Sequence, residues 1–276
     1  MVDGNEANFT GSVPEYYDRN LGPVIFEGYA SEMAKKAAAH VPRRVLELAA
    51  GTGIVTQQLR RALPPQSRLT ASDLNPPMLE IARGKLGSRD DVQFQPADAT
   101  QLPFGDRAFD LVVCQFGVMF FPDRPKSYRE VRRVLGPGGR YLLSVWDSLT
   151  YNPFGRVAFD AVSKFFPDDP PQFYAVPFGH NRIDEIRAEL SDAGFTDVHA
   201  HILRREEPNV DPIAFATGLV LGNPLGEQIR ARGTVSTDTV IDALAGALRE
   251  TLGLPNRTLS TQAIFIEATT LGGHAN

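Results

Sequence analysis

The sequence predicts an α/β protein built on a doubly wound, Rossmann-like and mostly parallel sheet. Short apolar segments alternate with segments of helical composition between residues 45 and 145. Strand and helix in alternation indicate parallel strands joined by right-handed crossovers, with helices on both faces of the sheet. The runs Val45–Leu48 and Leu111–Cys114 are apolar without alternation, which is typical of strands buried on both faces.

The elements of this core follow in chain order. Apolar residues recur at helical spacing from Pro14 to Pro42, so we expect an N-terminal helical segment over residues 12–40, after a polar and frayed first dozen residues. The expected strands are 45–48, 68–72, 92–95, 111–114 and 141–145, and the helices between them are 54–63, 78–86 and 125–135.

The pattern changes after Trp146. We expect helices over 157–166 and 182–193, a strand over 196–203, a largely helical insertion capped at Ser236 or Thr237, and a last strand over 263–268. This gives one domain over residues 1–276, with seven strands and the last one antiparallel beside the fifth and sixth. The insertions 148–181 and 211–255, together with the N-terminal segment, are expected to form a lid over the carboxyl edge of the sheet.

Composition narrows the class of partner. The formal net charge is -5, and an acidic balance argues against a nucleic-acid partner, whose affinity comes mainly from clustered Lys and Arg. Cys114 is the only cysteine, no apolar run is long enough to span a bilayer, and the first residues show no signal-peptide pattern. We therefore expect a cytoplasmic protein without a nucleic-acid partner.

The sharpest motif is the run VLELAAGTG, residues 45–53. A buried strand enters a glycine turn that opens a helix, and glycine is needed where the backbone turns sharply or lies against a ligand. The dinucleotide fingerprint is incomplete, because Thr56 occupies the third glycine position. Glu47 would repel a pyrophosphate but suits a ligand that carries an ammonium and a sulfonium. The alternative interpretation is a plain turn beside a surface glutamate.

Two more acids follow the next two strands. Asp73 lies twenty residues after Gly53, where a carboxylate can accept from both ribose hydroxyls of an adenosine, although NAD would use the same residue. Asp98 can accept from an adenine amino group, and its alternative is a turn former. Ligands of such sheets bind at the carboxyl ends of the strands, so the three acids together predict a binding site there.

These motifs, with the further runs ASDLNPPML, ADATQLPF, FDLVVCQFGVMFFPD and REVRRVLGPGGRYLLSVW, carry a family resemblance between Tyr16 and Trp146. The chain resembles the class I S-adenosylmethionine-dependent methyltransferases, most closely the small-molecule enzymes that include those of ubiquinone and menaquinone biosynthesis. The resemblance implies S-adenosylmethionine as the cofactor. It also implies these cofactor-binding residues: Tyr17 folding over the cofactor, Glu47, Gly51, Gly53 and Gln115 at the methionine part, Thr52 in the same glycine turn, Asp73 at the ribose, and Leu74, Met78, Asp98 and Ala99 at the adenine. One departure is Ala49, where many members have glycine, and we expect binding to survive it.

Other motifs suggest less. Asn75-Pro76-Pro77 resembles a motif of amino-group methyltransferases but follows the second strand rather than the fourth, so it is interpreted as a helix start. The glycines of Gly136–Gly139 are interpreted as a turn before a strand. The five histidines, His274 among them, form no recognisable metal site, and no metal is expected.

Methyl transfer from a sulfonium is an in-line displacement, so the protein mainly aligns the reactants and excludes water. A general base is needed only if the acceptor loses a proton, and the candidates are Tyr16, Tyr17 and His180. Plain helix packing is the alternative for each tyrosine, and a surface loop for His180. Aromatic residues in the insertions favour a lipophilic or aromatic acceptor: Phe154, Phe165, Phe166, Phe173, Tyr174, Phe178 and Phe215.

Three other function classes stay open at this point. A non-catalytic protein that binds the cofactor would show the same motifs. A nucleic-acid methyltransferase would normally carry more positive charge. An NAD-dependent dehydrogenase would share the fold and Asp73, but Glu47 and the missing third glycine argue against this class.

Overall fold

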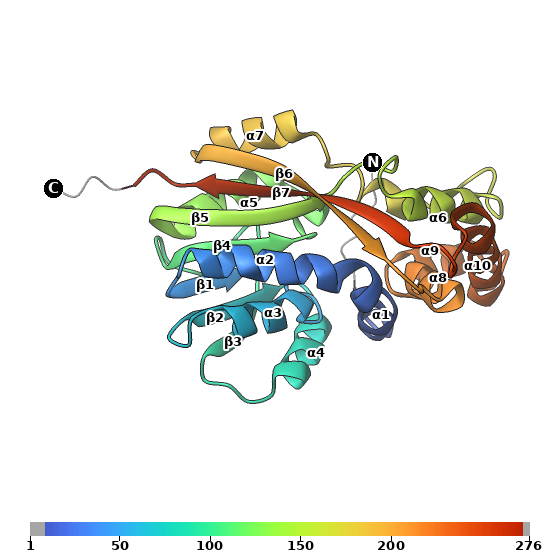
Figure 1. Cartoon of the computed structure of the whole chain (residues 1–276), viewed down its shortest axis with the longest axis horizontal. Helices are drawn as coiled ribbons and strands as arrows, with labels where there is room; N and C mark the ends of the chain where they lie inside the picture. The colour runs from blue at the N-terminus through green and yellow to red at the C-terminus, as the bar shows by residue number, and fades with distance from the viewer. Residues whose placement is uncertain (1–8, 273–276) are drawn as a thin grey trace.

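The computed structural model describes residues 9–272 and contains one seven-stranded sheet in the order β3-β2-β1-β4-β5-β7-β6 (Figure 1). The ends of the expected domain, residues 1–8 and 273–276, and with them His274, lie outside the described residues. The strands are β1 Arg44–Glu47, β2 Arg68–Asp73, β3 Val92–Pro96, β4 Phe109–Gln115, β5 Leu135–Trp146, β6 Thr196–Glu207 and β7 Leu259–Thr269.

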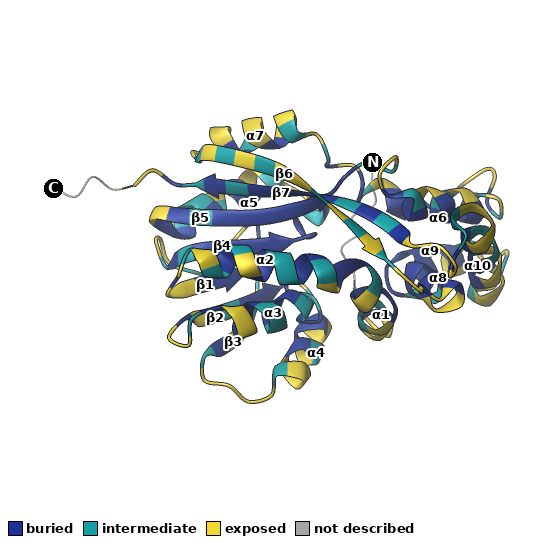
Figure 2. Cartoon of the chain, viewed as in Figure 1, coloured by how far each residue is buried: buried dark blue, intermediate teal, exposed yellow. Residues whose placement is uncertain are grey.

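Strands β1 to β5 pair in parallel, and β7 runs antiparallel between β5 and β6. The predicted sheet and the place of its last strand are therefore confirmed. The central strands are buried on both faces, as the unbroken apolar run of β4 predicted, and Leu111 to Cys114 have no exposed surface. The edge strand β6 alternates between intermediate and exposed residues (Figure 2).

Helices cover both faces of this sheet, with α2 and α3 in front of it and α5 behind it in Figure 1. They are α1 Val13–Tyr16, the π-helix η1 Tyr17–Phe26, α2 Glu27–Ala39, α3 Ile54–Ala62, α4 Pro76–Leu86, the 3₁₀ turn η2 Val118–Phe120, α5 Arg124–Val134, α6 Pro153–Ser163, the 3₁₀ turn η3 Phe173–Ala175, α7 Ile183–Asp192, α8 Pro212–Leu221, α9 Leu225–Arg232 and α10 Thr237–Leu252. Asn75 precedes α4 and Ser236 caps α10, as predicted. Of the helices between residues 9 and 272, none has the length and apolarity that crossing a membrane requires.

The helices of the two insertions gather beyond the carboxyl ends of the parallel strands (Figure 1). α10 packs on both α6 and α8, and α8 packs on η1. A side chain fixes where the first insertion begins: the fully buried Asn152 donates to the carbonyls of Asp147 and Gln262 at 2.9 Å. The first insertion is thus anchored at the end of β5 and to β7, at the edge where a ligand of such a sheet binds.

The run Gly136–Gly139 differs from its expectation. It does not form a turn ahead of the strand but lies inside β5, which starts at Leu135. The register steps from the pair Phe109–Leu135 to the pair Leu111–Arg140, so the glycines make a bulge. Gly138 takes a positive φ of 70°, which glycine adopts without strain.

Two strand ends hold non-glycine residues in the left-handed region. Ala49, just after β1, has φ 51°, and Phe116, just after β4, has φ 52°. Gly117 follows, and a Cβ there would lie 2.5 Å from the Cβ of Ala49 and 2.9 Å from the Sγ of Cys114. The glycine turn and the end of β4 therefore approach as closely as their backbones allow.

This contact predicts a coupled pair of substitutions. Gly117→Ala should lower the free energy of unfolding by about 1–3 kcal/mol through overpacking. Ala49→Gly removes a Cβ from a left-handed residue and should recover part of that loss in the double variant. Denaturant unfolding of the four proteins measures the coupling. Gly84→Ala is the control, because a Cβ there meets nothing within 4 Å. Strictly additive effects would contradict the contact.

Candidate functional site

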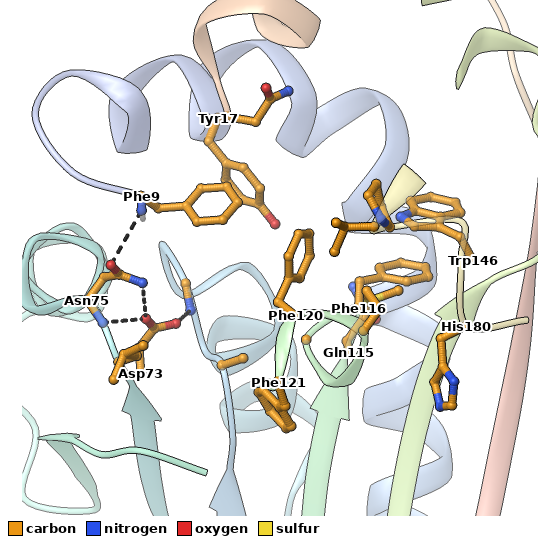
Figure 3. Close-up of a pocket in the computed structure, with 18 of the residues that line it drawn as sticks. Phe9, Tyr17, Asp73, Asn75, Gln115, Phe116, Phe120, Phe121, Trp146 and His180 are labelled. Atoms are coloured by element: carbon orange, nitrogen blue, oxygen red, sulfur yellow. Dashed lines mark hydrogen bonds between the residues drawn. The ribbon is translucent and has the colours of Figure 1, made fainter. Parts of the chain in front are cut away.

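A cavity of about 1060 Å³ opens at the carboxyl ends of the parallel strands (Figure 3). Its walls come from η1, the turns after β1, β2, β3 and β4, the end of β5, the start of α6, the segment 172–180 and α8. One end is polar and contains Asp73. The other is aromatic and contains Trp146, Phe154 and Phe178. The volume slightly exceeds that of a typical pocket for one drug-sized ligand, roughly 300–1,000 Å³.

Asp73 organises the polar end. One carboxylate oxygen accepts from the amide of Gly51 at 2.9 Å, and the other accepts from the amide of Asn75 at 2.8 Å. Burial raises the pKa of this carboxyl, although the backbone donors oppose the shift. Each carboxylate oxygen can accept more than one hydrogen bond, so Asp73 can still accept from a ligand hydroxyl.

Two buried acceptors on neighbouring strands lack a donor. The Oε2 of Glu47 and the Oε1 of Gln115 have no hydrogen-bond partner within the described part of the chain. Glu47 pairs with Val113 on β4 and with Ala71 on β2, each two residues before Gln115 and Asp73. Because side chains alternate along a strand, Glu47, Gln115 and Asp73 project from one face of the sheet.

Glu47 lies beneath the cavity rather than in its wall. It is absent from the described residues that line the cavity, and its side chain is 1% exposed. Burial raises the pKa of this carboxyl to about 8, a shift that Thr56 opposes and the nearby Asp73 enhances. An uncompensated acid at this depth is costly, and a cationic group would relieve the cost.

The predicted adenine residues surround the opening of the polar end. Leu74, Met78, Asp98 and Ala99 all line the cavity, and Leu74 is 57% exposed. Asp98 accepts through Oδ1 from the amide and the hydroxyl of Thr100, at 2.7 and 2.8 Å. The turn-former interpretation of Asp98 is therefore correct, and the residue also lines the cavity.

The glycine turn is tied to the N-terminal segment. Thr52 donates to Asp18 at 2.7 Å, and Lys85 of α4 makes an ion pair with the same carboxylate. Gly51 lines the cavity, and a Cβ there would meet nothing within 4 Å, so the turn is open on that side. Gly53 is different, because a Cβ there would lie 2.8 Å from the Cβ of Ala82. The missing side chain of Gly51 thus keeps the turn open to the cavity, while that of Gly53 allows close packing against α4.

Tyr17 and Tyr16 separate in the structure. Tyr17 points from η1 into the cavity (Figure 3), stacks on Phe26 with ring centroids 4.7 Å apart, and has its pKa raised by burial. Tyr16 is not among the described residues that line the cavity, and its ring lies against Arg19. Phe9 contacts the Tyr17 ring edge-on at 6.0 Å. The first dozen residues were expected to be frayed, and for Phe9 this expectation is wrong.

Aromatic rings build the other end. Trp146 stacks on Phe116 with centroids 4.0 Å apart and planes within 5°. Of the aromatic residues noted in the insertions, four line the cavity: Phe154, Phe173, Tyr174 and Phe178. Phe165, Phe166 and Phe215 do not, and they pack in the helical cluster. The acceptor end is therefore largely apolar.

His180 and Arg124 are the polar exceptions at this end. His180 is only 4% exposed and lines the cavity, so its interpretation as a surface loop residue is wrong. Its Nε2 lies 3.1 Å from the hydroxyl of Tyr128, and burial lowers its pKa to about 4. Arg124 was not predicted. The signal available was its place directly after the run GVMFFPD, at the first position of α5.

No cluster of three or more potential metal ligands occurs within residues 9–272. Cys114 is a fully buried strand residue, and burial raises the pKa of its thiol to about 12. The chemistry of the cavity thus depends on the acids at the strand ends and on the aromatic wall.

Burial of Glu47 predicts a pH-dependent stability. The folded-state pKa of about 8 lies above the ordinary value of 4.5, so the protein loses stability as pH rises through that window. At pH 8.5, Glu47→Gln should raise the free energy of unfolding by roughly 1–4 kcal/mol, and at pH 4.5 the difference should vanish. Denaturant unfolding at both pH values measures this, with the exposed Glu250→Gln as the control. A difference of equal size at both pH values would contradict the buried acid.

Comparison with known proteins identifies the family. A family described as a methyltransferase domain matches residues 46–143. The chain is 38% identical over 152 residues to a demethylmenaquinone methyltransferase of Deinococcus radiodurans, covering 54% of this chain and 63% of the relative. It is 31% identical over 171 residues to the ubiquinone/menaquinone biosynthesis C-methyltransferase UbiE of Cronobacter sakazakii, covering 57% of this chain and 68% of the relative.

A solved structure extends the likeness in fold. Phosphoethanolamine N-methyltransferase 2 of Haemonchus contortus, in complex with S-adenosyl-L-methionine, superposes with a TM-score of 0.62 at 15% identity, over 98% of this chain and 60% of that one. The sequence matches span less than two thirds of the first relatives' length, 63% and 52% for two of them. The methyltransferase-domain match includes β1 and the glycine turn that follows it. The chain belongs to the class I S-adenosylmethionine-dependent methyltransferases.

Proposed function

We propose that this protein transfers a methyl group from S-adenosylmethionine to a small, largely apolar and aromatic acceptor. The observation that carries the proposal is the pair of donorless buried acceptors, Glu47 and Gln115, on the same sheet face as Asp73. A ligand with a primary ammonium supplies the missing donors, and one with a ribose supplies hydroxyls to Asp73. The relatives' names, which concern quinone methylation, support an apolar ring as the acceptor.

The residues present fit this cofactor. Gly51 and Gln115 would hold its methionine part together with Glu47, whose side chain must turn toward the cavity to reach it. Asp73 would hold the ribose, while Leu74, Met78, Asp98 and Ala99 would hold the adenine. Bound there, the cofactor supplies an electrophilic methyl group on a sulfonium that is an excellent leaving group.

The chain's own contribution is alignment and exclusion of water. Tyr17 stacks on Phe26, and the ring of Phe26 lies 5.9 Å from that of Phe116, which stacks on Trp146, so these rings form one continuous aromatic wall. A flat ring held against such a wall loses orientational freedom, which lowers the barrier to an in-line displacement. We propose that Tyr17 forms a wall of the site, whereas Tyr16, which is not among the described residues that line the cavity, has no role in it.

His180 suits binding better than proton abstraction. A general base works best with a pKa near the working pH, and burial lowers the pKa of His180 to about 4. An imidazole of this kind is neutral at pH 7 and can donate or accept a hydrogen bond. An acceptor that must lose a proton therefore either ionises before it binds or uses water. The cytoplasmic location expected from the sequence stays a prediction.

Cofactor choice is tested by calorimetry with S-adenosylhomocysteine and NAD in parallel. We expect the first to bind in the micromolar range, and Asp73→Asn to weaken it by about 2–4 kcal/mol through loss of charge-assisted hydrogen bonds. Asp90→Asn, an exposed acid outside the cavity, is the matched control. Tighter binding of NAD, or unchanged affinity in the Asp73 variant, would refute the assignment. Turnover with any acceptor separates an enzyme from a non-catalytic binder.

We also propose that residues 12–40, 148–181 and 211–255 act as a lid. η1, η3 and α8 contribute cavity walls, and Asp18 links η1 to the glycine turn through Thr52. Lids belong to the less stable parts of a fold. Amide hydrogen exchange in these segments should be faster than in β1, β4 and β5.

Exchange in the lid should slow when S-adenosylhomocysteine is added, most strongly around Tyr17. Mass spectrometry of proteolytic fragments resolves these segments. If the glycine turn becomes protected while residues 13–26 do not respond, the N-terminal segment is a scaffold and the lid assignment fails there.

A further inference from the structure

The aromatic end of the cavity contains a cation. Arg124 and His180 line it, from the first turn of α5 and from the segment ahead of α7. In Figure 3, His180 and Trp146 lie on one side of the cavity and Asp73 on the other. A wholly apolar acceptor would cover these two polar side chains without offering them a hydrogen bond, and the polar groups of the cofactor are expected at the opposite end.

The guanidinium of Arg124 is poorly satisfied. Its Nε is buried and has no hydrogen-bond partner among the described residues, and the same holds for the Oε2 of Glu189. The two atoms are 3.7 Å apart, which is an ion pair beyond hydrogen-bond length. The side chain is 36% exposed. No other described side chain pairs with this guanidinium, and Arg124 lines the cavity, so its remaining N–H groups are available to a ligand oxygen.

The surrounding groups compensate the positive charge of Arg124 through a single ion pair, the one with Glu189. His180 contacts the Tyr128 hydroxyl at 3.1 Å and lies 3.8 Å from the Oε2 of Glu189. Burial lowers the pKa of the imidazole to about 4, so it is uncharged at neutral pH. Glu189 lies behind the guanidinium and does not line the cavity itself. From the cavity, a ligand therefore meets a cation and a neutral hydrogen-bonding ring.

We propose that the acceptor is an aromatic or alicyclic molecule with an acidic oxygen function, a carboxylate or an ionised hydroxyl, which Arg124 binds and His180 helps to orient. This inference rests on the proposed function and names its substrate class. The aromatic wall holds the ring, and Arg124 fixes which end points away from the methyl donor. Arg124 is thus a specificity-determining residue rather than a catalytic one.

Trp146 provides the readout, because it is the only tryptophan of the chain and lines the cavity. Its fluorescence is followed while 4-butylbenzoate or the uncharged 4-butylbenzamide is added, with S-adenosylhomocysteine at saturation. The benzoate should bind more tightly by roughly tenfold, the size of one hydrogen-bonded charge. Arg124→Gln should abolish this preference, while Arg124→Lys, which keeps the charge without the fork, should retain part of it. Arg129→Gln, exposed on the same helix, is the matched control and should behave as the wild type.

The outcomes separate the two proposals. Equal affinity for both probes in the wild type, no response to either probe, or a preference that survives in Arg124→Gln overturns the anionic acceptor. Calorimetry of S-adenosylhomocysteine on the same samples tests the proposed function independently, since Arg124 lies away from Asp73 and should not alter that affinity. If the cofactor binds normally but the carboxylate is not preferred, the proposed methyltransferase function stands and the proposed substrate class is refuted. If S-adenosylhomocysteine does not bind, the proposed methyltransferase function is refuted.

Discussion

Burial of hydrogen-bond acceptors without donors, at the carboxyl edge of the sheet, is the constraint on which the site depends. Parallel strands end at one edge, and β1 and β4 each bring a polar side chain there, Glu47 and Gln115. The Oε2 of Glu47 and the Oε1 of Gln115 find no partner within the described chain. The cost appears in the pKa of Glu47, raised to about 8. A fold that holds such groups is less stable than it could be, and a cationic ligand regains that free energy on binding. The same edge contains the left-handed residues Ala49 and Phe116, so backbone strain and electrostatic strain coincide.

The two halves of the cavity follow different physical rules. At the polar end, the group that a ligand meets is a backbone-anchored acid, Asp73, held by the Gly51 amide. At the acceptor end, most of the wall is aromatic and discriminates shape only weakly, because one methylene in an apolar pocket changes affinity by about 1–3 kcal/mol. A single charged group in such a wall discriminates more strongly. Arg124 is therefore the residue at this end from which selectivity is most readily gained.

The sequence predicted the elements whose signal is local. Unbroken apolar runs identified the central strands, and the acids at the ends of β1 and β2 identified the polar end of the cavity. Features that depend on tertiary approach were not predicted. The glycines of Gly136–Gly139 belong to β5 because its pairing with β4 absorbs a bulge. Phe9 is ordered because it meets the rings of Tyr17 and Phe120, which no local pattern shows.

The burial of single residues was the feature that the sequence predicted least well. His180 follows a segment rich in proline and glycine, which is typical of a surface loop, yet the segment folds inward beside Tyr128 and the histidine becomes 4% exposed. Arg124 stands at the start of a helix with polar neighbours, and only the fold of residues 172–180 turns its surroundings into a cavity wall. The methyltransferase-domain match ends at residue 143, so the segment that contains His180 and most of the insertion aromatics lies beyond it. It follows that Asp73 and Arg124 both lie in the part that the match covers, whereas His180 and the insertion aromatics must be interpreted from this chain's own structure.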